Sequence, residues 1–127
     1  MTGYVARARD APETAQLLLE AGRDAGAANR TYYAAFYAAQ AVIAHAAGIN
    51  PRTIKTHHGL RRLFELHVTK AGLIDHEIAT QFNNIASMRI IADYGDEPLH
   101  RDEVEAALRR AEAFVSACEN LVRSQKA

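Results

Sequence analysis

The sequence predicts an all-α protein, an antiparallel up-and-down bundle of four to five helices that forms a single domain over residues 1–127. Apolar residues recur three and four positions apart along most of the chain, and this spacing lines one face of a helix. The residues that end one predicted helix lie only a few positions before those that start the next, so the connections are short. Short connections favour antiparallel neighbouring helices. With 127 residues, the chain is long enough to bury a modest core but too short for two domains.

The first predicted helix starts from a capping pattern. Asp10 is followed by Pro12 and Glu13, so Asp10 is the expected N-cap, with the proline in the first turn. The helix is expected to run to about Gly22, where a glycine favours its end. An additional helical turn before it, over residues 4–9, is compatible with the sequence.

The second predicted helix, residues 24–47, is apolar on more than one face and ends at Gly48. A single neighbour in a one-layer bundle covers only one such face, so this helix has apolar area to spare. Tyrosines suit an interface that is apolar on one side and wet on the other. The sequence therefore predicts a homodimer formed through Tyr32, Tyr33 and Phe36. The alternative is a central helix that is buried within one monomer.

Three further helices complete the predicted bundle. Thr56 is the expected N-cap of the third, which Gly72 closes, and Asp75 is the expected N-cap of the fourth, which ends at Gly95. The fifth begins near residue 100 and runs to about residue 123.

Composition narrows the functional classes. The 15 basic and 15 acidic residues cancel, so any contact with nucleic acid must come from a local patch. The single cysteine, Cys118, excludes an internal disulfide and is in phase with neighbouring apolar residues, which predicts a buried, reduced thiol and a cytoplasmic location. No stretch approaches the roughly 20 apolar residues that span a bilayer, so no membrane association is expected.

Arg89 interrupts the apolar pattern of the fourth predicted helix. The stripe on which it falls contains Ile78, Phe82, Ile85 and Ala86. A guanidinium taken out of water needs a partner, because arginine cannot lose its charge. The expected partners are Asp93, Asp96, a second subunit or a ligand. The alternative is an arginine at the helix edge that reaches solvent and pairs locally with Asp93.

The segment 52–62 is the one concentration of basic residues. Its candidate ligand-binding residues are Arg52, Lys55, His57, His58, Arg61 and Arg62. Backbone amides at the start of a helix favour phosphate, so this segment is the expected site for RNA or nucleotide. If the segment folds next to Arg89, the two would form an anion-binding cleft. The alternative is a solvated helix start whose arginines face water. Adjacent histidines diverge on a helix and no third ligand completes a set, so no metal site is expected.

Four motifs carry a resemblance to a known family through their order and spacing. They are NRTYYAAFYAAQ at 29–40, KTHHGL at 55–60, KAGLI at 70–74 and RIIADYGD at 89–96. Together they resemble the HEPN domains, named for higher eukaryote and prokaryote nucleotide binding, and more narrowly the small stand-alone bacterial and archaeal proteins of that family. The resemblance spans residues 17–115. It implies a dimeric helical bundle, a role in nucleotide or RNA transactions, and frequent pairing with a minimal nucleotidyltransferase in toxin–antitoxin operons. No cofactor is expected.

This sequence departs from the catalytic signature of the family at one position. Ribonucleolytic members carry an arginine followed a few residues later by a histidine, and two copies meet across a dimer to cut RNA. Arg89 matches the arginine, but Tyr94 stands in the place of the histidine. A phenol with a pKa of about 10 is a poor general base at neutral pH, whereas an imidazole with a pKa of about 6.5 is a good one. Arg89 and Tyr94 are the candidate catalytic residues.

Three functions remain open at the level of sequence. In the first, the chain is the partner of a minimal nucleotidyltransferase, either as the toxin-like member or as a degenerate relative that binds nucleotide or RNA without cutting. In the second, it is a metal-independent ribonuclease in which a histidine such as His100, or one from the facing subunit, supplies the base. In the third, it is a non-catalytic structural or nucleotide-binding dimer. In related toxin–antitoxin pairs the nucleotidyltransferase modifies a tyrosine near the HEPN motif. Tyr94 is the tyrosine nearest to Arg89 in the sequence.

Overall fold

The computed structural model describes the backbone of residues 2–94 and 100–126 and the side chains of residues 3–88 and 100–124. This part of the chain is helical and contains no strand, which confirms the predicted fold class. Five α-helices follow one another in it: α1 Thr2–Glu20, α2 Asp24–Ala46, α3 His57–Phe64, α4 His76–Tyr94 and α5 Arg101–Lys126. A 3₁₀ turn, Pro51–Thr53, precedes α3, and a π-helical turn, Glu65–Thr69, extends it.

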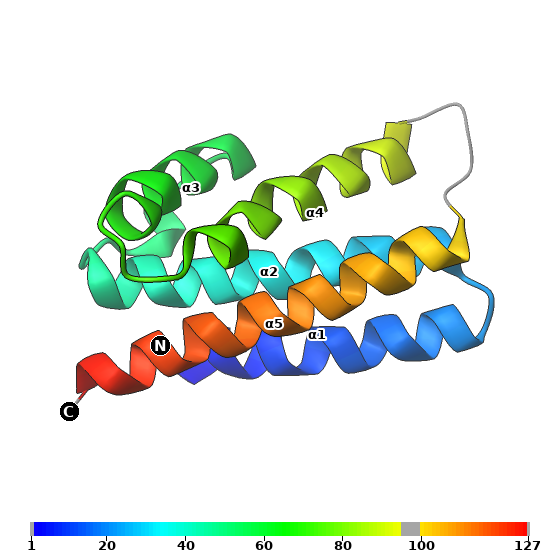
Figure 1. Cartoon of the computed structure of the whole chain (residues 1–127), viewed down its shortest axis with the longest axis horizontal. Helices are drawn as coiled ribbons and strands as arrows, with labels where there is room; N and C mark the ends of the chain where they lie inside the picture. The colour runs from blue at the N-terminus through cyan, green and yellow to red at the C-terminus, as the bar shows by residue number, and fades with distance from the viewer. Residues whose placement is uncertain (1, 95–99, 127) are drawn as a thin grey trace.

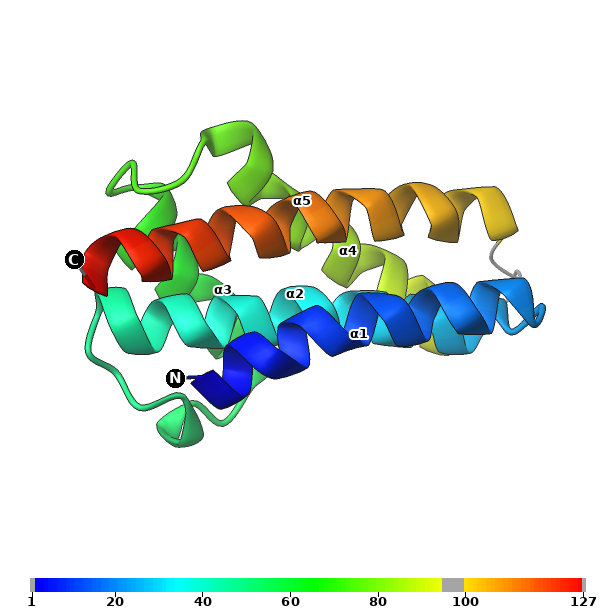
Figure 2. The ribbon, with the colours of Figure 1, turned by 90° about the horizontal axis from the view of Figure 1, so that it is seen from below.

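The four long helices alternate in direction along the length of the molecule, and the short helix α3 lies towards the end where the chain begins and finishes (Figure 1). Helix α2 is the centre of the bundle, because it contacts each of the other four helices. Helices α1 and α4 lie on opposite sides of α2, and α5 packs against all three of these helices (Figures 1 and 2). A central position accounts for the apolar character of several faces of α2 within a single chain.

The larger of two hydrophobic clusters is built around three aromatic rings. Phe64 of α3, Phe82 of α4 and Phe114 of α5 have ring centroids 5.4–5.6 Å apart and are at most 2% exposed. Burying a phenylalanine side chain typically stabilises the fold by about 1.5–3 kcal/mol. The second cluster joins α1, α2, α4 and α5 near the α1–α2 turn and consists of Ala15, Leu19, Ala27, Ala28, Met88, Val104, Ala107 and Leu108.

Cys118 faces the larger cluster from α5 and is 1% exposed. Burial raises the pKa of its thiol well above the ordinary value, because desolvation disfavours the thiolate. The predicted buried, reduced thiol is confirmed.

Helix α1 corrects the prediction for the start of the chain. It is one continuous helix, so Asp10 is not an N-cap and Pro12 lies inside the helix rather than in its first turn. The proline leaves the carbonyl of Ala8 without a helical N–H donor. Tyr4, in the first turns, packs against the larger cluster, and this tertiary contact outweighs the local capping preference. In Figure 2 the N-terminal half of α1 slants relative to its C-terminal half, as an internal proline favours.

The predicted starts of α3 and α4 are confirmed by their side-chain caps. Thr56 Oγ1 accepts a hydrogen bond from the Gly59 N–H at 2.8 Å. Asp75 Oδ1 accepts one from the Glu77 N–H at 2.9 Å. Each oxygen satisfies one of the N–H groups that a helix leaves unpaired in its first turn.

Three of the predicted helix ends carry glycines with positive φ angles of 75°, 67° and 71°, at Gly22, Gly48 and Gly72. The fourth, Gly95, lies outside the described residues. After α1, the Arg23 N–H donates to the Leu18 carbonyl at 2.8 Å and the Gly22 N–H donates to the Leu19 carbonyl at 3.0 Å. This pair of bonds is a Schellman motif, which satisfies the last carbonyls of the helix and requires the left-handed conformation at the glycine.

Candidate functional site

His57, the first residue of α3, lies against the aromatic face of α2. Its ring centroid is 4.8 Å from that of Phe36, 5.4 Å from that of Tyr32 and 6.1 Å from that of Tyr33. Its Nδ1 is hydrogen-bonded to the Tyr32 hydroxyl, and the tautomer of the imidazole decides which group donates. Because Tyr32 is 1% exposed, this bond holds His57 against the core.

The local sequence fixes where His57 lies. The Thr56 cap starts α3 at the histidine, and the capped N–H belongs to Gly59. A Cβ atom at Gly59 would lie 2.9 Å from Thr56 Oγ1, closer than side chains tolerate, so the cap and the glycine depend on each other. The threonine and the glycine of the Thr-His-His-Gly motif therefore go together because the cap at the start of α3 needs both.

Arg61 connects α3 to α4. Its Nε donates to Asn83 Oδ1 at 3.1 Å, between two residues that are separated by 22 positions. Asn83 precedes Arg89 on the same helix, so this hydrogen bond connects α3 to the helix that carries the motif arginine.

The six basic residues of segment 52–62 do not converge on one point. Arg52 faces a cavity next to α1, His57 packs on α2 and Arg61 binds Asn83. The remaining three, Lys55, His58 and Arg62, are exposed. Arg62 also lines a second cavity of about 460 Å³ on the outer side of α3, together with Lys70. The six side chains therefore have different surroundings, and their role in binding an anion stays a prediction.

The aromatic face of α2 remains partly open to solvent. Tyr33, Phe36 and Tyr37 are half-buried, with the Tyr33 and Tyr37 ring centroids 5.7 Å apart. The Arg30 guanidinium lies 4.9 Å from the Tyr33 ring centroid, and the Arg7 guanidinium lies 5.9 Å from that of Tyr37. These contacts place positive charge at both ends of the aromatic row. Of the three predicted interface residues, Tyr32 is already buried within the chain, whereas Tyr33 and Phe36 are partly accessible.

The motif residues themselves lie at the edge of what the structure describes. Helix α4 extends through Arg89, Asp93 and Tyr94, but their side chains lie outside the described residues, as does the whole of Asp96. His100 is exposed and directly precedes α5. The predicted roles of these five residues therefore stay predictions.

No group of three or more histidine, cysteine, aspartate or glutamate side chains among the described residues is arranged to hold a metal ion. None of the helices in this part of the chain has the length and apolar character that a membrane crossing requires.

Comparison with known proteins places the chain in a family. It is 32% identical over 121 residues to a UPF0332 protein of Thermotoga maritima, an alignment that covers 94% of this chain and 89% of the relative. It is 30% identical over 107 residues to a UPF0332 protein of Gloeobacter violaceus, covering 84% and 82% of the two chains. The model of the HEPN domain family matches residues 1–121. The chain therefore belongs to the HEPN family.

Proposed function

We propose that the protein is the RNA- or nucleotide-binding partner of a minimal nucleotidyltransferase, in a cytoplasmic pair of the toxin–antitoxin type, and that its ribonuclease motif is degenerate. One observation carries the binding part. The Arg61–Asn83 hydrogen bond joins the basic helix α3 to α4, the helix that contains Arg89. Asn83 and Arg89 are about 9 Å apart along the helix axis at 1.5 Å per residue. Pairing with a nucleotidyltransferase is supported by membership of the HEPN family.

The exposed side of α3 supplies charge for phosphate. His58 and Arg62 lie one turn apart on this helix and both are exposed, and Lys55 is exposed just before the Thr56 cap. Guanidinium and ammonium groups bind phosphate through charge-assisted hydrogen bonds. The positive end of the helix dipole at the start of α3 also favours an anion. These contacts are independent of base identity, which fits binding to single-stranded RNA without strong sequence preference.

Equilibrium binding of a fluorescent single-stranded RNA tests this role. Replacing Arg62 with glutamine should weaken binding and lower the slope of log K against log salt by about 0.7, the value for one phosphate contact on a single strand. Arg110→Gln is the matched control, because it removes the same charge from an exposed arginine on a different helix, α5. Equal affinity of wild type and Arg62→Gln across the salt series would contradict binding at α3.

The ribonuclease alternative predicts a different result with the same RNA. Cleavage that continues in EDTA and is lost in Arg89→Ala would establish a metal-independent ribonuclease. Loss of that cleavage in His100→Ala as well would identify His100 as the replacement base. We expect binding without cleavage, because a tyrosine at position 94 is a poor general base at neutral pH.

The nucleotidyltransferase partnership is tested through Tyr94, the last residue of α4. Transfer from a nucleoside triphosphate would join the α-phosphate to the Tyr94 hydroxyl oxygen and release pyrophosphate. The attached phosphate would lie close to Arg89 and offset the charge that binds RNA. Co-expression with the nucleotidyltransferase followed by intact-mass measurement should show a gain of whole nucleotide units. The gain should disappear in Tyr94→Phe and persist in Tyr37→Phe. An unmodified protein, or equal modification of the Tyr94→Phe variant, rejects this site.

A further inference from the structure

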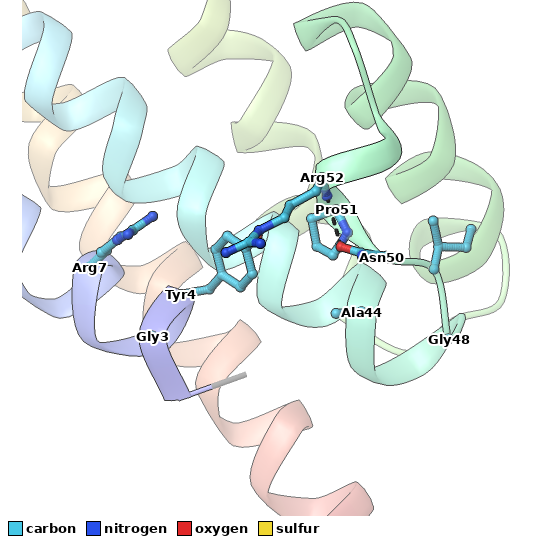
Figure 3. A pocket seen from close by; sticks show the side chains of 9 residues that line it. Gly3, Tyr4, Arg7, Ala44, Gly48, Asn50, Pro51 and Arg52 are labelled. Atoms are coloured by element: carbon cyan, nitrogen blue, oxygen red, sulfur yellow. Dashed lines mark hydrogen bonds between the residues drawn. The ribbon is translucent and has the colours of Figure 1, made fainter.

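A cavity of about 520 Å³ lies between the first turns of α1 and the segment that follows α2 (Figure 3). It is lined by Gly3, Tyr4, Arg7, Ala44, Gly48, Ile49, Asn50, Pro51 and Arg52. No residue of α3 or α4 contributes to this lining, so the cavity is separate from the Arg61–Asn83 contact. None of the nine lining residues is acidic.

The cavity places two positive charges together without a carboxylate to balance them. Arg7 and Arg52 are both exposed, and within the described residues neither forms an ion pair. The Arg7 guanidinium lies over the Tyr37 ring, 5.9 Å from its centroid. Two like charges that share a cavity repel each other, and a bound anion relieves that repulsion.

The remaining polar groups of the cavity include a further donor and an aromatic ring. Asn50 Oδ1 accepts the Arg52 backbone N–H at 3.0 Å, which leaves the Asn50 amide nitrogen free to donate to a ligand. In Figure 3 the Arg52 side chain extends towards the ring of Tyr4. Tyr4 is half-buried, so part of its ring is accessible. The cavity thus combines hydrogen-bond donors, positive charge and a surface on which a base can stack.

We propose that this cavity binds the terminal phosphate of a nucleotide, with Arg7 and Arg52 on the phosphate and Tyr4 against the base. A doubly charged phosphate monoester matches two guanidinium groups better than the singly charged diester within an RNA chain does. The volume lies inside the range of about 300–1,000 Å³ that is typical of small-molecule sites. Two sources share this chemistry: a free mononucleotide and the 5′-phosphate end of an RNA.

The test compares AMP, a 5′-phosphorylated pentanucleotide and the same pentanucleotide with a 5′-hydroxyl, by calorimetry or fluorescence at constant ionic strength. We expect the phosphorylated ligand to bind more tightly than the hydroxylated one. Arg7→Gln and Arg52→Gln should each weaken phosphorylated-ligand binding about tenfold or more, which corresponds to the loss of one hydrogen bond to a charged group. Arg110→Gln removes an exposed charge on α5 and should leave binding unchanged. Circular dichroism confirms that each variant is folded.

The outcomes separate the two sources and the two sites. Saturable AMP binding that depends on both arginines assigns a free nucleotide to the cavity, whereas arginine-dependent binding of the phosphorylated pentanucleotide alone assigns an RNA 5′ end. Equal affinity for the phosphorylated and hydroxylated pentanucleotides, without AMP binding, overturns the site. So does binding that is unchanged in Arg7→Gln and Arg52→Gln. Sensitivity of the hydroxylated pentanucleotide to Arg62→Gln reports on α3 alone, so failure of one site is distinguishable from failure of the other.

Discussion

The bond between Tyr32 and His57 is a polar contact between the aromatic face of α2 and α3. Both groups are amphipathic, with a ring that packs and a polar atom that needs a partner. Tyr32 is buried to 1% exposure, so its hydroxyl has little access to water and relies on the protein for hydrogen bonding. The contact therefore ties the orientation of the histidine to the core of the bundle.

Replacing Tyr32 with phenylalanine should lower the free energy of unfolding by about 1–3 kcal/mol, because the substitution leaves a polar nitrogen of His57 without this partner. Urea unfolding measures the change. Tyr37→Phe is the matched control, since Tyr37 is half-buried on the same helix and the same atom is removed. A loss in Tyr32→Phe no larger than in the control would show that the bond contributes little.

Arg89 occupies the next position on the stripe of α4 that includes Phe82, Ile85 and Ala86, all of which are buried. We expect Arg89→Ala to lower the free energy of unfolding by about 3–5 kcal/mol. Removing one partner from a buried ion pair leaves the other charge buried without a counter-charge. Thermal or urea unfolding measures it, with Arg110→Ala as the exposed comparison, for which about 0–1 kcal/mol is expected. A change near zero in the free energy of unfolding of Arg89→Ala would show that the arginine is exposed and does not stabilise the fold.

At the scale of the helix, local sequence signals predicted the ends that side chains and glycines determine. Thr56, Asp75 and Gly72 act as predicted because their hydrogen bonds lie within a few residues of one another. Asp10 has the same kind of local signal, but the packing of Tyr4 on the core extends α1 through it. A tertiary contact of this kind cannot be read from a window of neighbouring residues.

The same limit applies to the candidate site. The charge pattern singles out segment 52–62, but it does not show that His57 packs on α2, that Arg61 binds Asn83 or that Arg52 lines a cavity next to α1. The partners Tyr32 and Asn83 are 25 and 22 positions from His57 and Arg61, and the pairing depends on how α2 and α4 pass α3. The cavity of Arg7 and Arg52 was missed for the same reason, because it joins α1 to the end of α2.

Two glycines near the α1–α2 turn give opposite predictions for one substitution. Gly22 has a φ of 75°, so Gly22→Ala should lower the free energy of unfolding by about 1–2 kcal/mol through strain in the left-handed conformation. Gly26 lies inside α2, and a Cβ there would meet Leu18 Cδ1 at an ordinary 3.5 Å. Gly26→Ala should therefore raise stability by about 0.5–1 kcal/mol. Urea unfolding of both variants tests the pair, and the same sign for both would contradict the assigned geometry.

At the scale of the whole molecule, α2 is largely covered by the other helices, which leaves its half-buried aromatic row as the accessible part. Burial of Tyr32 within the chain narrows the predicted interface to Tyr33 and Phe36. A row of rings with one accessible face suits contact with a second copy of the chain, because tyrosine and phenylalanine supply much apolar area per side chain.

We therefore expect a homodimer in solution that Tyr33→Glu dissociates, because two like charges would meet near the two-fold axis without water to screen them. Light scattering over a concentration series measures the mass. Leu17→Glu and Leu66→Glu are the matched controls, since these leucines are 65% and 57% exposed on other surfaces. A monomer of the unaltered protein at high concentration would end the idea of a dimer. A dimer that either leucine variant dissociates and Tyr33→Glu leaves intact would move the interface away from α2.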